Sequence, residues 1–302
     1  MIDRSELLSI VVCPTCKRAL TLFSHCSHCG ANYSEVSGTP ALIPHDANRT
    51  VSFLFNQNRS VAGNRFRDCF KYPPRRGAAG PDKPYHLDLA HIDVLDKLAP
   101  SSIVLEVGCG GAQMRKYLES RNQRYVGIDI SKTRVSDNLQ QHGGPDLLCD
   151  SHFLPFADCV FDLVYTAAVT EHLACPYLAV QEVARVLKAG GFYLGNVSFL
   201  EPWHDDSYMH MSPLGVFELL TQAEFDVLNI WPGQGYSGFR AILSMGNKAT
   251  KLLTPLGEVV YFIYRFGNRI RNLVKRRENW REDDIADLAK VAGATDWIAK
   301  RQ

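Results

Sequence analysis

The chain has 302 residues, of which 46% are hydrophobic and 22% charged, and its formal net charge is +1. This composition is typical of a globular protein with one large α/β domain and smaller additions. The near-neutral charge argues against a protein that grips a long nucleic acid through a basic face, although a local basic patch is compatible with it.

The first residues do not form a secretion signal. Met1–Glu6 is charged, and no apolar run with a small-residue cleavage site follows. No window of the sequence approaches the roughly 18 consecutive apolar residues of a membrane-spanning helix. We therefore expect a cytoplasmic protein, with peripheral membrane attachment as an open alternative.

Residues 1–46 contain two Cys-x-x-Cys pairs separated by nine residues. The four cysteines are Cys13, Cys16, Cys26 and Cys29. In a chain without a secretion signal such thiols are expected to be reduced, and four thiolates complete a tetrahedral zinc site. So short a segment buries little core, and the metal would supply much of its folding energy. An iron site of the rubredoxin type and metal-free thiols remain as alternatives.

Residues 47–84 are predicted to connect this unit to the next. The second half, Lys71–Pro84, is rich in proline and glycine and is expected to form a flexible, lid-like loop. It contains Arg75 and Arg76, which we expect to be solvated, with contact to a substrate or phosphate as the alternative.

Residues 85–245 alternate strand-like and helix-like patterns, which predicts a Rossmann-like α/β domain with a mostly parallel sheet and helices on both faces. The expected parallel strands are Ile103–Val107, Tyr125–Ile128, Leu147–Cys149, Val160–Thr166 and Phe192–Val197. Two further segments, Val227–Trp231 and Phe239–Met245, are predicted to close the sheet as antiparallel strands at one edge.

Residues 246–302 are predicted to form a helical C-terminal extension. Between positions 256 and 276, apolar residues occupy one arc of a helix and basic residues the other. Such a helix either docks its apolar arc on the protein's own core or lies on an anionic membrane surface. The sequence leaves both alternatives open.

A set of residues at the expected strand ends predicts a nucleoside cofactor. Gly108 and Gly110 follow the first strand, but Gln113 stands where a dinucleotide-binding fingerprint has its third glycine. Acidic residues end three strands, namely Glu106, Asp129 and Asp150. A carboxylate after the second strand can accept both ribose hydroxyls, and one after the third can accept the adenine amine. This pattern favours S-adenosylmethionine over a dinucleotide.

These motifs resemble those of the class I S-adenosylmethionine-dependent methyltransferases, and most closely the type 11, UbiE-like group. The resemblance covers about residues 86–245 and includes Leu154-Pro155-Phe156 and Arg185–Gly191, where Ala189 replaces the usual proline. It implies a seven-stranded sheet with an antiparallel last strand. It also implies that Cys109, Ile130 and Ser151 lie beside the cofactor.

The N-terminal unit is similar to the Trm112-like zinc ribbons, through its cysteine pairs and the later Gly38–Pro44 segment. A zinc ribbon ahead of a methyltransferase domain also resembles a group of bacterial rRNA guanine methyltransferases. That likeness raises RNA as an acceptor, but only by analogy of fold.

Histidines are the strongest candidates for a general base near neutral pH. His172 follows the fourth strand, and His204 and His210 lie in a polar and aromatic segment after the fifth. An architectural role for His172 is the alternative. A second hypothesis is a divalent metal held by His204, Asp205 and His210, and a third is a purely structural loop.

The sequence therefore predicts a methyltransferase that acts on an oxygen of a small molecule or glycan, with a nitrogen or carbon acceptor left open. The fourth strand lacks the Asn/Asp-Pro-Pro-aromatic run that marks exocyclic-amine methyltransferases of nucleic acids. An rRNA or tRNA methyltransferase guided by the zinc ribbon is the first alternative, and it predicts that Lys17, Arg18, Arg75 and Arg76 converge near the site. A non-catalytic partner protein is the second alternative. The oligomeric state is open.

Overall fold

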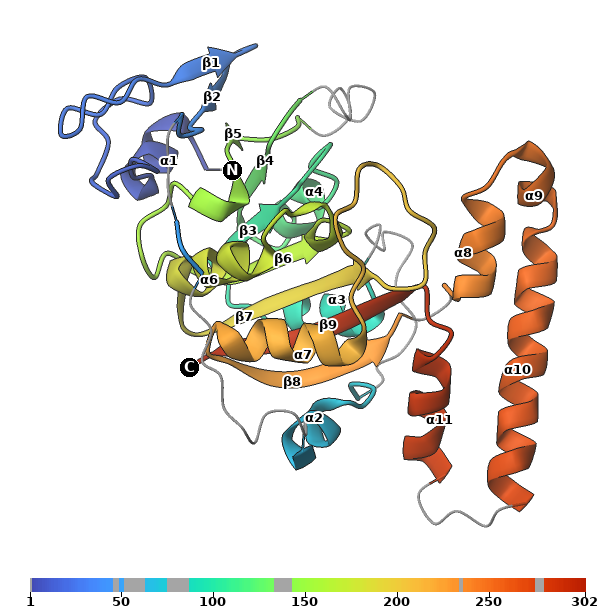
Figure 1. The fold of residues 1–302 in the computed structure, drawn as a ribbon. Helices are drawn as coiled ribbons and strands as arrows, with labels where there is room; N and C mark the ends of the chain where they lie inside the picture. The colour runs from blue at the N-terminus through green and yellow to red at the C-terminus, as the bar shows by residue number, and fades with distance from the viewer. Residues whose placement is uncertain are drawn as a thin grey trace.

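A computed structural model describes residues 2–45, 49–51, 63–74, 87–132, 143–233, 236–274 and 280–302. The described residues form a nine-stranded sheet in the order β1-β2-β5-β4-β3-β6-β7-β9-β8 (Figure 1). The strands are β1 Ser34–Val36, β2 Thr39–Ala41, β3 Ile103–Val107, β4 Arg124–Asp129, β5 Leu147–Leu148, β6 Phe161–Ala167, β7 Leu187–Ser198, β8 Phe225–Pro232 and β9 Ala294–Arg301. The expected count of seven is therefore wrong, because the N-terminal hairpin β1–β2 extends the same sheet.

Helices cover both faces of the sheet. One core cluster packs α6 and α7 on one face, and a second packs α3, α4 and α11 on the other. The helices that build these layers are α3 Leu89–Asp96, α4 Arg115–Glu119, α6 Pro176–Val186, α7 Pro213–Gln222 and α11 Trp280–Ala289, with α2 Gly63–Cys69 beside β8. The central strands β5, β4, β3, β6 and β7 are parallel, as the sequence predicts. Their carboxyl ends therefore lie along one edge.

The last antiparallel strand differs from the prediction. Phe239–Met245 was expected to be a strand, but helix α8 occupies Gly238–Ser244, where the side chain of Ser237 caps the helix by accepting from the Arg240 amide. The strand is instead β9, which pairs antiparallel with both β7 and β8. Alternating apolar residues over so short a span fit either element, and the N-terminal cap favours the helix.

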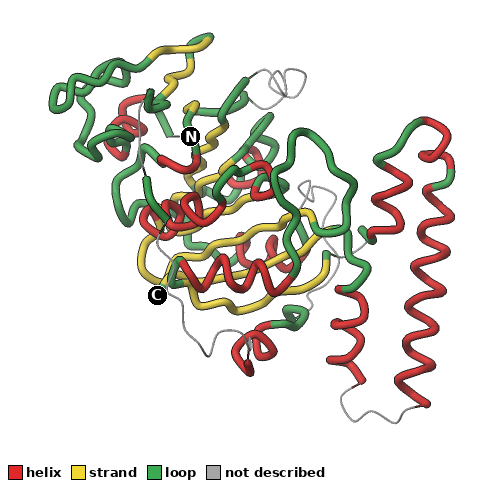
Figure 2. The backbone as a smooth tube through the Cα atoms, in the orientation of Figure 1, coloured by secondary structure: helices red, strands yellow, loops and turns green. Residues whose placement is uncertain are grey.

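The C-terminal extension is helical only in part. Helices α8, α9 Lys248–Leu252, α10 Thr254–Val274 and α11 form an insertion between β8 and β9 that stands beside the sheet (Figure 2). The final residues then return to the sheet as β9. The predicted domain boundaries at residues 46, 84 and 245 remain a prediction. Strand β9, in the last of these segments, is part of the sheet.

Helix α10 exposes its apolar side. Its apolar face consists of Leu256, Val259, Phe262, Ile263, Phe266, Ile270 and Leu273, each between 46% and 67% exposed. The buried side is small or polar, with Gly257, Asn268 and Asn272. The alternative in which this arc docks on the protein's own core is therefore wrong. Within the described residues no helix is long and apolar enough to span a membrane.

The N-terminal unit, which includes α1 Arg4–Ile10, is joined to the sheet by backbone pairing and by charge. Strand β2 pairs with β5, and the Val12 amide donates to the Pro155 carbonyl. Buried Glu182 of α6 binds Lys17 at 2.8 Å and Arg49 at 2.9 Å. Burial alone would raise the pKa of Glu182, but hydrogen bonds and charges from Arg185 and Lys17 lower it to about 2. The N-terminal unit thus shares one sheet and one core cluster with the larger domain.

Candidate functional site

The glycine loop after β3 has the geometry of a close backbone approach. Gly108 and Gly110 have φ angles of 72° and 49°, in the left-handed region that favours glycine. A Cβ atom at Gly108 would lie 2.3 Å from a methyl carbon of Val169, which follows β6. The loop is tied to the end of β4, because the Gly110 amide donates to Asp129 Oδ2 at 2.9 Å. The loop therefore joins the ends of three strands.

Asp150 follows β5, which is the third of the predicted strands, as expected. Its carboxylate accepts from the backbone and the ring of His152, at 2.9 and 2.5 Å, and caps the short helix η3 Ser151–Phe153. Burial alone would raise the pKa of Asp150, but the hydrogen bonds from His152 lower it. The side chain is a fixed anion beside Ser151, which is buried.

Glu106 lies beneath the glycine loop and is almost fully buried. The Tyr125 hydroxyl donates to its carboxylate, and burial raises the pKa of Glu106 to about 7. The Cys109 side chain, between the two glycines of the loop, is also buried, so its backbone is the part that can contact a ligand. Ile130 differs from both, because it is 51% exposed directly after Asp129.

These residues fit a nucleoside that carries an amino acid. Asp129 keeps free lone pairs on each oxygen after it accepts from the Gly110 and Ser131 amides. The exposed Ile130 offers an apolar surface for a base, and Gly108 and Gly110 carry no side chain that would stand between the loop backbone and a ligand. The expected cofactor residues thus gather at the carboxyl edge of β3, β4 and β5.

The sequence reading missed a supporting pair below this edge. Asp146 accepts from the Gly127 amide at 2.8 Å and from Arg115, whose guanidinium lies 4.6 Å from the centre of the Tyr125 ring. These contacts fix the strand that ends in Asp129. No local motif marks Asp146 or Arg115, since they meet only through the fold.

The three candidate histidines lie together. The ring centres of His172 and His204 are 5.5 Å apart, and those of His204 and His210 are 5.7 Å apart. His204 Nδ1 donates to the Pro202 carbonyl, and His210 Nε2 lies 3.2 Å from the Ser207 hydroxyl. The sequence names these three residues as separate candidates, and the structure brings them together.

Glu171 also belongs to this cluster, and the sequence reading did not name it. It lies in the short helix η4 Thr170–His172 and is fully buried. The Ser198 hydroxyl donates to Glu171 Oε1 at 2.7 Å. Glutamate directly before a candidate histidine was the available signal. One nitrogen of His172, one of His204 and one oxygen of Glu171 lie within 4.8 Å of one another.

Two large aromatic side chains stand exposed above the histidines. Trp203 is 73% exposed and Tyr208 67%. The Trp203 indole donates to the Ser207 carbonyl, and the Tyr208 amide donates to the Glu171 carbonyl. Exposed aromatic side chains that hydrogen bonds fix near Glu171 and the histidines are a suitable surface for an organic ligand.

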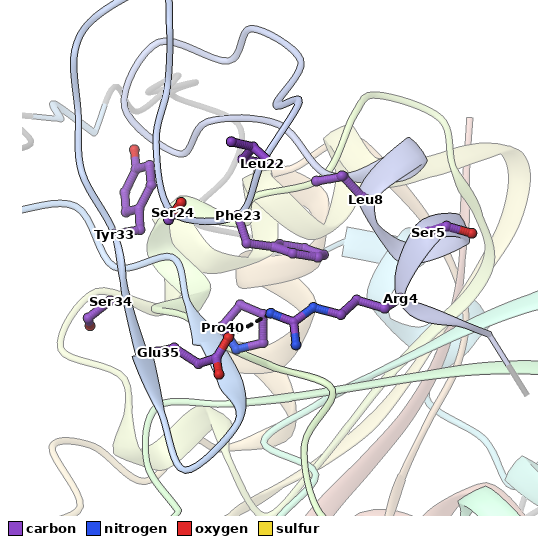
Figure 3. Close-up of a pocket in the computed structure, with 10 residues that line it drawn as sticks. All are labelled: Arg4, Ser5, Leu8, Leu22, Phe23, Ser24, Tyr33, Ser34, Glu35 and Pro40. Carbon is purple, nitrogen blue, oxygen red and sulfur yellow. Dashed lines mark hydrogen bonds and ion pairs between the residues drawn. The ribbon is translucent and has the colours of Figure 1, made fainter.

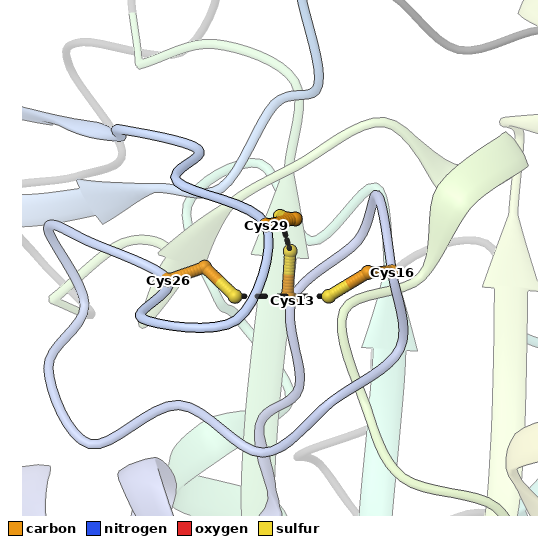
Figure 4. Close-up of side chains that lie close together, drawn as sticks. All are labelled: Cys13, Cys16, Cys26 and Cys29. Carbon is orange, nitrogen blue, oxygen red and sulfur yellow. Dashed lines mark hydrogen bonds between the residues drawn. The ribbon is translucent and has the colours of Figure 1, made fainter.

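The four cysteines of the N-terminal unit converge on one point (Figure 4). Cys13 Sγ lies 3.6 Å from Cys29 Sγ, and Cys16 Sγ 3.6 Å from Cys26 Sγ. Sulfurs bound to a tetrahedral zinc at 2.3 Å would be about 3.8 Å apart. The Tyr33 hydroxyl lies 2.9 Å from Cys13 Sγ, where it can donate to a bound thiolate. The donor set fits a zinc ion.

A separate hollow lies on the outer side of this unit (Figure 3). Phe23 and Pro40 form its apolar part, and the Arg4 guanidinium stacks on Phe23 while it binds Glu35 at 2.6 Å. The internal ion pair satisfies both charges. The hollow lies outside the cofactor edge.

Comparisons with known proteins point to one family. The profile described as "Methyltransferase domain" matches residues 105–195, from β3 into β7. A protein of Encephalitozoon cuniculi that is named "Putative methyltransferase" is 32% identical in an alignment of 156 residues, which covers 42% of this chain and 72% of that protein. An uncharacterised methyltransferase of Synechocystis sp. is 29% identical over 132 residues, which are 42% of this chain and 59% of that protein.

A third relative is named for its acceptor. A fatty-acid O-methyltransferase of Mycolicibacterium smegmatis is 34% identical over 116 residues, which are 36% of this chain and 40% of that protein. The chain thus spans less than two thirds of the length of two of these three relatives.

Proposed function

The chain belongs to the S-adenosylmethionine-dependent methyltransferases, and from that premise we propose that it methylates an oxygen atom of a small molecule or glycan. The cofactor lies at the carboxyl edge, with Asp129 binding the ribose, Asp150 the adenine amine and the Gly108–Gly110 backbone the methionine part. When bound, S-adenosylmethionine supplies an electrophilic methyl group on a sulfonium. The chain's own part is to orient the acceptor and to remove its proton.

The observation that carries this proposal is the histidine cluster beside the cofactor edge. His172, His204 and His210 meet next to η4, and Val169 of the same segment touches the glycine loop. A hydroxyl acceptor needs a base, and imidazole has a suitable pKa range. His210 is the candidate base, because it is half-buried beside the other two histidines and its Nε2 lies 3.2 Å from the Ser207 hydroxyl. The relative named as a fatty-acid O-methyltransferase is consistent with an oxygen acceptor.

The positions of the basic residues in the structure give the RNA alternative less support than the oxygen acceptor. Its four basic residues were expected to converge near the site, but Lys17 is bound to Glu182 within the interface between the ribbon and the larger domain. Arg75 and Arg76 lie outside the described residues, and Arg18 is exposed. The alternative of a non-catalytic partner protein conflicts with the family assignment.

The acceptor class can be tested with methyl-labelled S-adenosylmethionine and a fractionated cell extract. We expect label in the small-molecule, lipid or glycan fraction, on an oxygen by mass spectrometry. His210→Ala should lower turnover by about 100-fold while cofactor affinity stays unchanged. Label in the RNA fraction would overturn the proposal in favour of the RNA alternative. Turnover of His210→Ala equal to that of the wild type would contradict the role of His210 as the base.

We further propose that Cys13, Cys16, Cys26 and Cys29 hold a structural zinc ion. The sulfur separations and the Tyr33 hydroxyl support this assignment over metal-free thiols. All four positions are filled by protein ligands, which is the pattern of a structural rather than a catalytic site.

We also propose that α10 attaches the protein peripherally to an anionic membrane surface from the cytoplasmic side. Its apolar face is exposed along the length of the helix, and exposed Lys248, Lys251 and Arg269 lie on the same insertion. The one acidic residue of α9 and α10, Glu258, is bound to Arg240. An apolar face with unpaired basic neighbours suits a surface of anionic lipids. Lys275 and Arg276 lie outside the described residues.

Membrane attachment predicts that charge on the apolar face releases the protein from vesicles. Ile263→Glu with Phe266→Glu should abolish co-sedimentation with phosphatidylglycerol vesicles. Leu214→Glu, on a residue of α7 that is 47% exposed, should leave it intact. Unchanged sedimentation of the double variant would contradict the proposal. A wild-type dimer that the double variant dissociates, without vesicle binding, would assign the face to a second copy instead.

A further inference from the structure

A second metal-ligating cluster lies at the acceptor end of the site, formed by Glu171, His172 and His204. One ligand atom of each lies within 4.8 Å of the other two. Two imidazoles and one carboxylate are a set that binds zinc and related divalent ions with positions left open for a ligand. This set differs from the combination of His204, Asp205 and His210 that the sequence suggests, because Glu171 and His172 take the places of Asp205 and His210.

The atoms that point into this cluster lack partners. Glu171 is 0% exposed, and its Oε2 accepts no hydrogen bond from the residues that the structure describes. His172 Nδ1 is also buried and without a hydrogen-bond partner among them. Buried polar atoms are rarely left unsatisfied, since each costs about 1–3 kcal/mol. An unsatisfied carboxylate oxygen and an unsatisfied imidazole nitrogen on residues of one metal-ligating cluster point to a missing cation.

The surrounding contacts orient the ligands as an outer shell does in metal sites. The Ser198 hydroxyl donates to Glu171 Oε1, which leaves Oε2 for an ion. His204 Nδ1 donates to the Pro202 carbonyl, which leaves the Nε2 lone pair free. Such second hydrogen bonds fix the tautomer and direction of a ligating histidine. Glu201 adds a carboxylate 3.8 Å from His204 Nε2.

We propose that Glu171, His172 and His204 bind a divalent transition-metal ion, with Zn²⁺ as the representative, and that this ion binds the acceptor oxygen. Ligand atoms about 2.1 Å from one ion lie about 3.4 Å apart, so binding draws the three side chains together by about 1 Å.

The ion has a defined part in the transfer, and this step rests on the proposed function. An acceptor hydroxyl bound to the ion loses its proton more readily to His210, the base of the proposed function, because the cation stabilises the oxyanion. The oxygen lone pair then forms the new bond to the methyl carbon. The carbon–sulfur bond breaks with its electron pair going to sulfur, and the neutral thioether leaves.

The site can be tested by metal binding without any acceptor. The protein is first loaded with one zinc ion per chain, which fills the cysteine site, and Zn²⁺ is then titrated by calorimetry. We expect a second site in the wild type, weakened more than tenfold in Glu171→Gln and in His172→Ala with His204→Ala. His45→Ala removes an exposed histidine elsewhere and should leave binding unchanged. Mg²⁺, which prefers oxygen ligands, should bind weakly.

The outcomes separate this proposal from the proposed function. Uptake of a single zinc ion per chain by the wild type, or equal second-site affinity in all variants, would overturn the metal site and leave methyl transfer untouched. A second site with normal affinity, in a protein whose label enters only RNA, would keep the metal and overturn the oxygen acceptor. Because Glu171→Gln alters a buried residue, the histidine double variant with unchanged circular dichroism carries the test.

Discussion

At the scale of single residues, Glu106 imposes a pH dependence on stability. Its folded pKa of about 7 lies above its ordinary value of 4.5. Below pH 4.5 the carboxyl group is protonated in both states. As the pH rises toward 7, only the unfolded chain gains ionisation, so the free energy of unfolding falls.

The loss is about 3 kcal/mol for a gap of about 2.5 pH units. Glu106→Gln lacks this ionisation and should not show it. Urea unfolding of the protein without cofactor at pH 4.5 and pH 8 measures the difference. Parallel profiles for the two proteins would mean that Glu106 is ionised in its buried position.

Gly108 is required for two reasons, its left-handed backbone and the contact with Val169. Gly108→Ala should therefore lower the free energy of unfolding by about 3 kcal/mol and weaken cofactor binding. Gly38→Ala is the matched control, because φ is 80° there but no atom lies within 4 Å of the added Cβ. It should cost about 1 kcal/mol. Equal losses in the two variants would show that Val169 moves aside freely.

The sequence predicts well where the candidate cofactor residues stand in the fold, because each follows a strand with a clear apolar run. Asp129 and Asp150 stand at the ends of β4 and β5, where the prediction has them. Glu171 is different. Its importance comes from burial and from Ser198 of β7, a contact across 27 positions that no local pattern records.

At the scale of elements, the missed strand has a physical reason. About 60 residues separate β8 from β9, so the last strand lies far from the others in sequence. Its segment also carries Asp296 and Lys300, which weaken the apolar signal. The position of β9 between β7 and β8 is evident only from the three-dimensional structure.

Strand β9 predicts a large effect for its central residue. Trp297 is fully buried, and a Cβ on Gly195 of β7 would lie 2.2 Å from its ring. Trp297→Ala should lower the free energy of unfolding by about 4 kcal/mol. Leu273→Ala, on the exposed face of α10, should change it by less than about 0.5 kcal/mol. An equally small loss in the free energy of unfolding in both variants, measured by denaturant titration, would contradict the position of β9 in the sheet.

At the scale of the whole molecule, the ribbon and the larger domain share one sheet and one core cluster. Loss of the zinc ion that we propose for the four cysteines should therefore destabilise the entire protein. We expect Cys16→Ser to lower the midpoint of a single thermal transition by more than about 5 °C. Calorimetry that shows a separate small transition for the ribbon, with the main one unchanged, would contradict this coupling.

The central claim is that the carboxyl edge of the sheet holds the cofactor that the methyl group comes from. Calorimetric titration of S-adenosylmethionine into the wild type and Asp129→Ala tests it most directly. The account predicts one cofactor per chain in the wild type and a loss of affinity of more than about tenfold in Asp129→Ala, with circular dichroism unchanged. Equal affinity in the two proteins would contradict the assignment of this edge as the cofactor site.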